Sequence, residues 1–184
     1  RIHVELEGRR VSAPSGATVL QLLQQEGRHD PESADPVVLA SLNGRRVSLA
    51  AGLRNDDRVR LIRLTDPLAQ TTIQRTAQFL VQVAAEKLFP GVTLKVQFSI
   101  GGGMYCELQR PEPMTPQVVA DLEAEMRDLV ARNLPLTPQR FGLRALLKIF
   151  ERRGAEADIA AIRYLRRDSL LLYSMEGSDL LYYG

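Results

Sequence analysis

The sequence predicts an α+β protein built from two successive units, residues 1–66 and 67–184. Short runs alternate between apolar and polar residues, which is the pattern of a strand with one buried face. Longer stretches repeat apolar residues three and four positions apart, which is the pattern of an amphipathic helix. Asp66-Pro67 interrupts these patterns, so we place the boundary between the two units there. A chain of 184 residues has room for one ordinary domain or two small ones.

The first unit is predicted to be a small mixed sheet covered by one helix. Residues 2–7 alternate between apolar and polar, and Gly8-Arg9-Arg10 turns the chain into a second strand that begins at Val11. Residues 17–25 place a valine and several leucines on one helical face, and Gly27 stands where a helix would end. Three further strands are expected at residues 37–42, 46–49 and 58–64.

The second unit is predicted to start with a long helix over residues 73–89. Strict alternation over residues 94–100, a turn at Gly101-Gly102-Gly103 and a return strand over residues 104–108 predict a second hairpin. Thr115-Pro116 combines a cap residue with a proline at the first helical position, so an amphipathic helix follows. The remaining elements are expected to be helices over residues 143–153 and 155–165 and strands over residues 169–174 and 179–183.

The composition excludes several classes of protein. Hydrophobic residues make up 45% and charged residues 25%, as in an ordinary globular protein. No apolar run approaches the roughly 18 residues that span a bilayer, and the first residues lack the layout of a signal peptide. We therefore expect a cytoplasmic protein without a membrane partner. Cys106, His3 and His29 cannot supply a tetrahedral zinc site from cysteine and histidine alone, so we expect no metal.

The glycine run at residues 101–103 is interpreted as a turn, with a ligand contact as the alternative. Backbone amides in a glycine loop can bind a phosphate, but a kinase-type loop needs Gly-Lys-Ser/Thr and a helix after it. Here a strand is expected to follow, and that tripeptide occurs nowhere in the chain. We therefore expect no phosphoryl-transfer site within these residues.

Charge is unevenly distributed, although the net charge is only +2. Residues 132–167 hold nine Lys or Arg against three acids, whereas residues 112–128 hold five acids against Arg127 alone. Arg144, Lys148 and Arg152 are four residues apart and so share one helical face, where they could contact the phosphates of RNA or of a nucleotide. The alternative is a solvated face that pairs with the acidic helix; a stripe of arginines without interleaved aromatic residues indicates nucleic-acid binding only weakly. The candidate anion or RNA surface comprises Arg140, Arg144, Lys148, Arg152, Arg153, Arg163, Arg166 and Arg167.

Residues 1–66 resemble the TGS domain that begins bacterial threonyl-tRNA synthetase. The resemblance lies in Gly16-Ala17-Thr18-Val19-Leu20, in Leu42-Asn43-Gly44-Arg45-Arg46-Val47-Ser48-Leu49 and in Asp56-Asp57-Arg58-Val59-Arg60-Leu61-Ile62. It implies a ubiquitin-like β-grasp fold for this unit.

Residues 73–184 resemble the editing domain that follows the TGS domain in the same family. The matching segments are Lys87-Leu88-Phe89-Pro90, Gly103-Met104-Tyr105-Cys106-Glu107, Thr115-Pro116 and Asp179-Leu180. The resemblance implies a second α+β domain of the threonyl-tRNA or alanyl-tRNA synthetase editing type.

The family's editing site uses a His-x-x-x-His pair on the long helix, and the resemblance places these positions at Arg75 and Phe79. The family's cysteine falls at Leu181 or Tyr182. A guanidinium and a phenyl ring cannot replace imidazole as ligand or base, so we expect a degenerate domain without catalytic residues. The pocket is expected to be lined by Arg75, Phe79, Tyr105 and Tyr182. Arg75 would hold a phosphate or carboxylate there, or pair with an acid such as Glu107 or Asp179.

Three tyrosines and one cysteine in the expected strands have both a functional and a structural interpretation. Tyr105, Tyr182 and Tyr183 could stack on a base, although tyrosines in strands are more often part of a core. Cys106 is expected to be a small buried hydrophobic residue, because no histidine base is expected beside it.

A narrower resemblance is to the N-terminal half of bacterial uridine kinase-like proteins. It lies in Gln139-Arg140-Phe141, Ile149-Phe150-Glu151-Arg152-Arg153-Gly154, Arg163-Tyr164-Leu165-Arg166-Arg167 and Leu172-Tyr173-Ser174-Met175-Glu176-Gly177. It implies a non-catalytic binding or regulatory module whose partner is its own nucleoside kinase domain beyond Gly184, with ATP and Mg bound there and no cofactor in this chain. The alternative is a stand-alone tRNA-binding or trans-editing protein, an aminoacyl-tRNA deacylase related to threonyl-tRNA synthetase, with tRNA or a nucleotide as partner.

Overall fold

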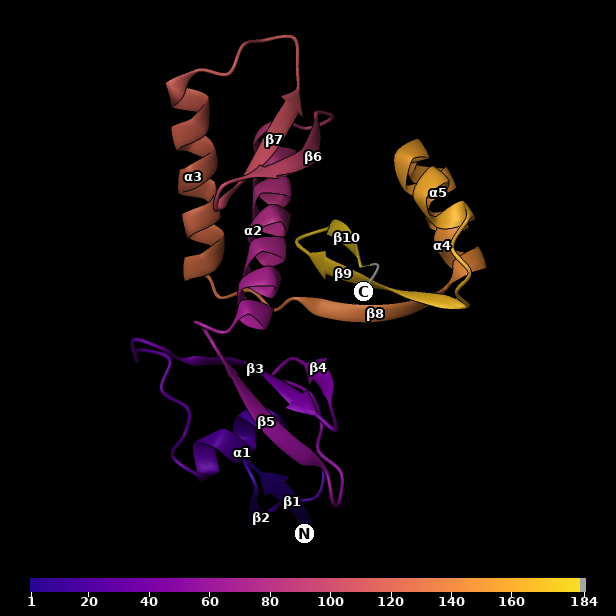
Figure 1. Ribbon diagram of the computed structural model, residues 1–184. Coiled ribbons are helices and arrows are strands. Elements are labelled where there is room, and N and C mark those ends of the chain that lie inside the picture. The colour runs from indigo at the N-terminus through magenta and orange to yellow at the C-terminus, as the bar shows by residue number, and fades with distance from the viewer. Residues whose placement is uncertain (183–184) are drawn as a thin grey trace. The chain divides into compact units, whose positions relative to one another are not determined.

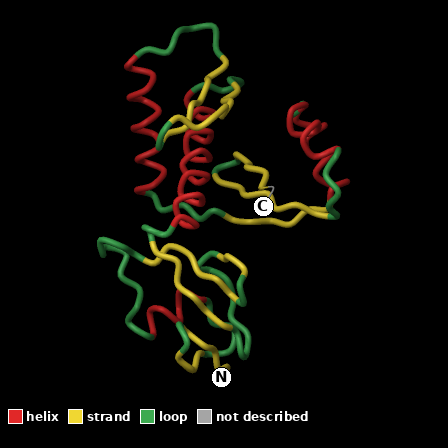
Figure 2. The backbone as a smooth tube through the Cα atoms, in the orientation of Figure 1, coloured by secondary structure: helices red, strands yellow, loops and turns green. Residues whose placement is uncertain are grey.

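The computed structural model describes residues 1–182; the side chains of Ser99, Thr137, Arg153, Ala157 and residues 180–182 lie outside the description. Helices and strands follow one another in mixed order (Figures 1 and 2), which confirms the predicted α+β class. The chain divides into two compact units, Arg1–Thr76 and Ala77–Gly184. The boundary expected from the sequence, between residues 66 and 67, lies ten residues before the one between these compact units. The division into domains at residues 66 and 67 stays a prediction.

The first unit is a five-stranded mixed sheet with one short helix. The strand order is β2-β1-β5-β3-β4; β1 runs parallel to β5, and the other neighbouring strands are antiparallel. This is the arrangement that the resemblance to a β-grasp domain implies. The elements are β1 (Ile2–Leu6), β2 (Arg9–Ala13), α1 (Val19–Gln25), β3 (Val37–Leu42), β4 (Arg45–Val47) and β5 (Arg58–Arg63).

Local signals set both ends of α1. The Thr18 side chain accepts a hydrogen bond from the Gln21 amide, and the Gln21 side chain accepts one from the Thr18 amide, so this capping box starts the helix at Val19 rather than at residue 17. Gly27 has a positive φ of 64°; its amide donates to the Gln24 carbonyl and the Arg28 amide donates to the Leu23 carbonyl, as in a Schellman motif. The helix buries its apolar face, Val19, Leu22 and Leu23, in the sheet's core.

A small polar network fixes the loop between β4 and β5. Asp57 is 8% exposed, and its carboxylate accepts hydrogen bonds from the Asn43 side-chain amide and the Arg54 backbone amide, both at 2.7 Å. Asn43 in turn accepts one from the Arg58 amide at 2.8 Å. Asn43 and Gly44 both have positive φ, as the predicted turn requires. A carboxylate with two donors is satisfied despite its burial.

The long helix α2 (Pro67–Leu88) starts six residues earlier than expected. Asp66 accepts hydrogen bonds from the Leu68 amide on its side chain and from the Ala69 and Gln70 amides on its carbonyl. Pro67 lacks an amide proton and is tolerated in the first turn. The break at Asp66-Pro67 is therefore a helix start, and the long helix runs on from it.

The second unit contains a two-stranded sheet, β6-β7, and a three-stranded sheet in the order β10-β9-β8. One core gathers around Phe79, Leu108 and Leu129, and another around Leu146 and Ile162. Among the described residues, none of the helices combines the length and apolarity that crossing a membrane requires. The elements are β6 (Thr93–Ile100), β7 (Gly103–Gln109), α3 (Pro116–Ala131), β8 (Thr137–Gly142), α4 (Leu143–Arg153), α5 (Glu156–Arg163), β9 (Ser169–Met175) and β10 (Ser178–Tyr182).

Strand β8 was not predicted, because its sequence does not alternate between apolar and polar residues. It forms by antiparallel pairing with β9, which places Arg140 opposite Leu171. Pro138 is compatible with this position because β8 lies at the edge of its sheet, where a missing amide donor is tolerated.

Candidate functional site

Phe79, to which the resemblance assigns one histidine of the family's editing site, lies in the hydrophobic core of the second unit. Its side chain is 1% exposed and belongs to the same cluster as Val83, Leu108 and Leu122. The ring fills space between helices and a strand and offers no polar group. A solvated metal pocket cannot occupy the same volume.

Arg75 lies one helical turn before Phe79, in the part of α2 that belongs to the first unit. Its side chain is exposed and engages a neighbouring group. The residues expected to line one pocket with it belong to the second unit. Tyr182 ends β10, but its side chain lies outside the described residues, as does Tyr183 altogether.

The β6–β7 hairpin separates Tyr105 from the core. The register shifts between Val96 and Phe98, so Val96 pairs with Cys106 whereas Phe98 pairs with Tyr105. This bulge moves Phe98 to the outer face, where its ring stacks on Tyr105 at a centroid distance of 5.1 Å. Tyr105 is 46% exposed, so it is not the core residue that its strand position favoured.

Cys106 occupies the inner face of the same hairpin and is partly buried. Burial raises the pKa of its thiol, so the protonated form is favoured. A nucleophilic cysteine needs the opposite shift. Among the described residues, no three His, Cys, Asp or Glu side chains gather as a metal site would require.

The acidic helix α3 forms ion pairs, but its partners are not the cations of α4. Its acids pair with Lys87 at 2.5 Å, with Arg127 on the helix itself at 2.5 Å and with Arg132 at 3.5 Å. Within the part of the chain whose side chains are described, no ion pair joins α3 to the basic residues of α4 or α5. The expected pairing of the basic stripe with the acidic helix is therefore not seen.

Helix α4 has one buried face and one cationic face. Leu146 and Phe150 are 0% and 4% exposed and pack in the core with α5 and β9. Arg144, Lys148 and Arg152 point to solvent and span about 12 Å along the axis, at 1.5 Å per residue. We call these three residues the α4 cationic face. None of them forms an ion pair with any side chain that the structure describes.

Apart from Arg153, which ends α4, the other candidate cations lie on segments that reach the start of this helix. Arg140 on β8 donates a hydrogen bond to the Ser169 hydroxyl at 3.1 Å. The Leu143 amide donates to the Asp168 carbonyl at 3.1 Å, so the segment from α5 to β9 passes beside the first residue of α4. That segment carries Arg163, Arg166 and Arg167, all exposed. The side chain of Arg153 lies outside the described residues.

One residue of this region was missed by the sequence analysis. Tyr164 lies between Arg163 and Arg166 and is 82% exposed. The signal was present in the sequence, because Arg163-Tyr164-Leu165-Arg166-Arg167 interleaves an aromatic residue with cations. The basic surface therefore does contain an exposed aromatic ring.

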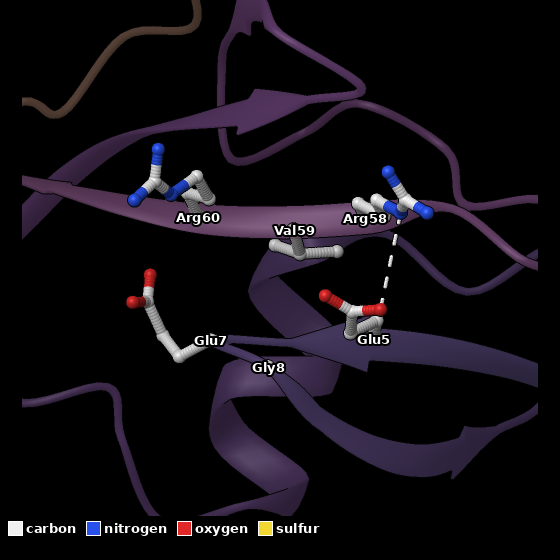
Figure 3. A pocket seen from close by; sticks show the side chains of 6 residues that line it. All are labelled: Glu5, Glu7, Gly8, Arg58, Val59 and Arg60. Carbon is white, nitrogen blue, oxygen red and sulfur yellow. Dashed lines mark ion pairs between the residues drawn. The ribbon is translucent and has the colours of Figure 1, made fainter.

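Two shallow hollows of about 470 and 480 Å³ lie on the first unit and share Arg58 and Arg60. Figure 3 shows Glu5 and Glu7 facing these arginines across the first hollow, with Glu5 and Arg58 paired at 3.9 Å. The Glu7 carboxylate accepts a hydrogen bond from the Leu61 amide. Acids that are already engaged balance the arginines here, so these hollows are weaker candidates than the α4 cationic face.

No known family model matches the chain. It is similar, however, to threonine–tRNA ligases from several bacteria. The ligase of Symbiobacterium thermophilum is 25% identical over 177 residues, 96% of this chain and 27% of the ligase. That of Acidiphilium cryptum is 28% identical over 150 residues, 82% of this chain and 23% of the ligase. That of Pelobacter propionicus is 26% identical over 168 residues, 91% of this chain and 26% of the ligase.

These matches support the resemblance to threonyl-tRNA synthetase stated from the sequence. The relatives named here are ligases, and none of them supports the narrower resemblance to uridine kinase-like proteins. The chain spans about a quarter of the length of these relatives. Over nearly all of its own length, this α+β chain is distantly similar to threonine–tRNA ligases.

Proposed function

We propose that this chain is a tRNA-binding module that contacts the RNA backbone through the α4 cationic face. The observation that carries the proposal is the position of Arg144, Lys148 and Arg152 on the solvent side of α4, without an acidic partner among the described side chains. The relatives are named as ligases of threonine and tRNA, which makes tRNA the polyanion to test first.

Unpaired cations on a rigid helix suit phosphate binding. Lys and Arg that neutralise phosphates release counterions, which gives most of the affinity of a non-specific contact. The planar guanidinium groups of Arg144 and Arg152 can each donate two parallel hydrogen bonds to phosphate oxygens. The opposite side of α4 is buried, so the helix presents these side chains without losing its packing.

Hydrolysis of aminoacyl-tRNA by a histidine site is not part of the proposed function. The two positions to which the resemblance assigns histidines hold Arg75, whose guanidinium has only N–H donors, and Phe79, which lies in the core. Neither side chain can bind a metal or accept a proton from water. We therefore propose binding without chemistry at these positions.

A salt titration tests the proposal. Binding of the chain to tRNA is measured at several salt concentrations for the wild type and for a variant with Arg144→Ala, Lys148→Ala and Arg152→Ala. Each lost phosphate contact lowers the slope of log K against log salt by about 0.7 to 0.9, so the variant is expected to lose about 2 to 3 units of slope.

The matched control removes the same charge from the first unit. Arg10→Ala, Arg45→Ala and Arg60→Ala also take away three exposed arginines and are expected to leave the slope unchanged. Absence of salt-dependent tRNA binding by the wild type would refute the proposed function. Equal slopes for the wild type and the α4 variant would refute the assignment to α4.

Two other functions remain separate predictions. A non-catalytic module of a uridine kinase-like protein requires a nucleoside kinase domain beyond Gly184 that binds ATP and Mg, and a frame continuing into Gly-x-x-x-x-Gly-Lys-Ser/Thr would support it. A trans-editing deacylase requires release of an amino acid from mischarged tRNA, lost on substitution of Arg75. A cytoplasmic location without a membrane partner is part of all three proposals.

A further inference from the structure

Tyr164 is the most exposed large hydrophobic side chain among those that the structure describes. It is 82% exposed, and the next value is 63%, for Ile100. An aromatic side chain stabilises the folded state when it is buried, so an exposed ring here does not contribute to the stability of the fold in this way. Single exposed apolar residues are common on protein surfaces, and the surroundings of the ring decide what it does.

The backbone on both sides of Tyr164 is anchored. Tyr164 is the C-cap residue of α5, the helix whose Ile162 is fully buried. The next residue, Leu165, packs against the same core and donates its amide to the Ile162 carbonyl at 3.1 Å. The ring is therefore presented to solvent from a fixed position.

Two exposed cations lie close to this ring in the sequence. Arg163 and Arg166 flank it, are exposed, and form no ion pair with any described side chain. The hydrogen bond from Leu143 to Asp168 brings the same segment next to the first turn of α4, where Arg144 begins the α4 cationic face. The segment that carries the ring thus lies beside the start of the α4 cationic face.

An aromatic ring among unpaired cations is the combination that binds single-stranded nucleic acid. Every base has a π-face that can stack on a tyrosine, while arginines contact the phosphates on either side. Bases inside a duplex are already stacked on each other and are not available to a side chain. The chemistry of this site thus selects an unpaired RNA segment over a helical one.

We propose that Tyr164 stacks on an unpaired base of the bound RNA, with Arg163 and Arg166 on the adjacent phosphates. This inference rests on the proposed function and extends it, because it assigns a single-stranded segment to the α5–β9 end of the basic surface. The duplex part of the RNA is left to the α4 cationic face.

The chain contains no tryptophan, which allows a direct test. Tyr164→Trp introduces a single reporter, and its fluorescence is expected to be quenched when a short single-stranded RNA is added but not when an RNA duplex of the same length is added. Tyr105→Trp is the matched control, because it places the single tryptophan at another exposed tyrosine of the same unit. Its fluorescence is expected to stay constant.

Affinity measurements separate stacking from charge. Tyr164→Ala is expected to weaken binding of single-stranded RNA about ten-fold, whereas Tyr164→Phe retains the affinity. Tyr164→Ala removes no charge, so the salt slope stays the same, while Arg163→Ala or Arg166→Ala lowers the slope by about 0.7. The far-ultraviolet circular dichroism of each variant checks that it is folded.

Three results would overturn the inference. If tRNA binds and Tyr164→Trp does not respond to single-stranded RNA, the stacking role is refuted while the proposed function stands. If an acidic peptide quenches the reporter as strongly as RNA, the partner is a protein. If no RNA binds at any salt concentration, the proposed function fails and the stacking role fails with it.

Discussion

Replacing Phe79 with alanine tests whether this position, to which the resemblance assigns a histidine, is part of a hydrophobic core. The ring is 1% exposed and is packed among side chains of α2, β7 and α3. Truncating a buried phenylalanine to alanine costs about 3 to 5 kcal/mol, because the apolar contact is lost and a cavity remains. Against a total stability of about 5 to 15 kcal/mol, such a loss is large.

Phe98 provides the matched control for the same substitution. Its ring is 52% exposed and contacts Tyr105 in a stack at 5.1 Å. Loss of an aromatic pair costs about 0.5 to 1.5 kcal/mol. The two variants are therefore expected to differ by about 1.5 to 4.5 kcal/mol in the free energy of unfolding of the second unit.

Urea unfolding followed by circular dichroism gives the free energies, and the single cysteine identifies the unit that unfolds. Cys106 lies on β7 in the second unit, so its reaction with a thiol reagent reports when this unit opens. If Phe79→Ala costs no more than Phe98→Ala, the ring is not part of the packing. Phe79 would then line an open pocket, and the argument against a working site at this position would fail.

Three further predictions concern other parts of the chain. Asp57→Ala is expected to lower the free energy of unfolding of the first unit by about 2 to 3 kcal/mol, because the two donors to this buried carboxylate lose their acceptor. The control Asp56→Asn keeps a residue type that tolerates the left-handed backbone, so its free energy of unfolding in urea is expected to change by no more than about 0.5 kcal/mol. Burial raises the pKa of the Cys106 thiol, so its alkylation rate is expected to reach half its maximum at a pH above the pKa of a free cysteine, which is about 8.5. A midpoint below that pH would contradict the partly buried position of this side chain. Glu7→Ala is expected to lower the melting temperature, because the Glu7 carboxylate accepts a hydrogen bond from a strand amide. The control Glu5→Ala removes only an exposed ion pair at 3.9 Å and is expected to lower it less. Equal shifts in melting temperature would show that the hydrogen bond to Glu7 contributes nothing.

Much of the fold could be predicted because its signals are local. Thr18 and Gln21 form a capping box, Gly27 ends the same helix, and Gly154 ends α4 in the left-handed conformation. These residues act through neighbours at most five positions away, so their effect can be read from a short window. All five strands of the first unit were likewise expected from short apolar or alternating runs bounded by turn residues.

The errors occur where a distant partner decides the structure. Strand β8 exists because β9 pairs with it, and its own residues do not alternate. The bulge in β6 reverses the faces of Phe98 and Ile100, although the run from Leu94 to Ile100 alternates without interruption. A one-residue shift of register moves a side chain to the other face of a sheet, and composition does not reveal it.

The candidate site divides in the same way. The sequence by itself determined the kinds of charge and their order: the basic stretch, the acidic helix before it, and the absence of a histidine at residues 75 and 79. Only the tertiary structure decided which charges are paired and which rings are buried, so that Phe79 lies in the core, Tyr164 lies in solvent, and α3 finds its partners away from α4. Burial and pairing depend on which distant segments come together, and that information belongs to the folded chain as a whole.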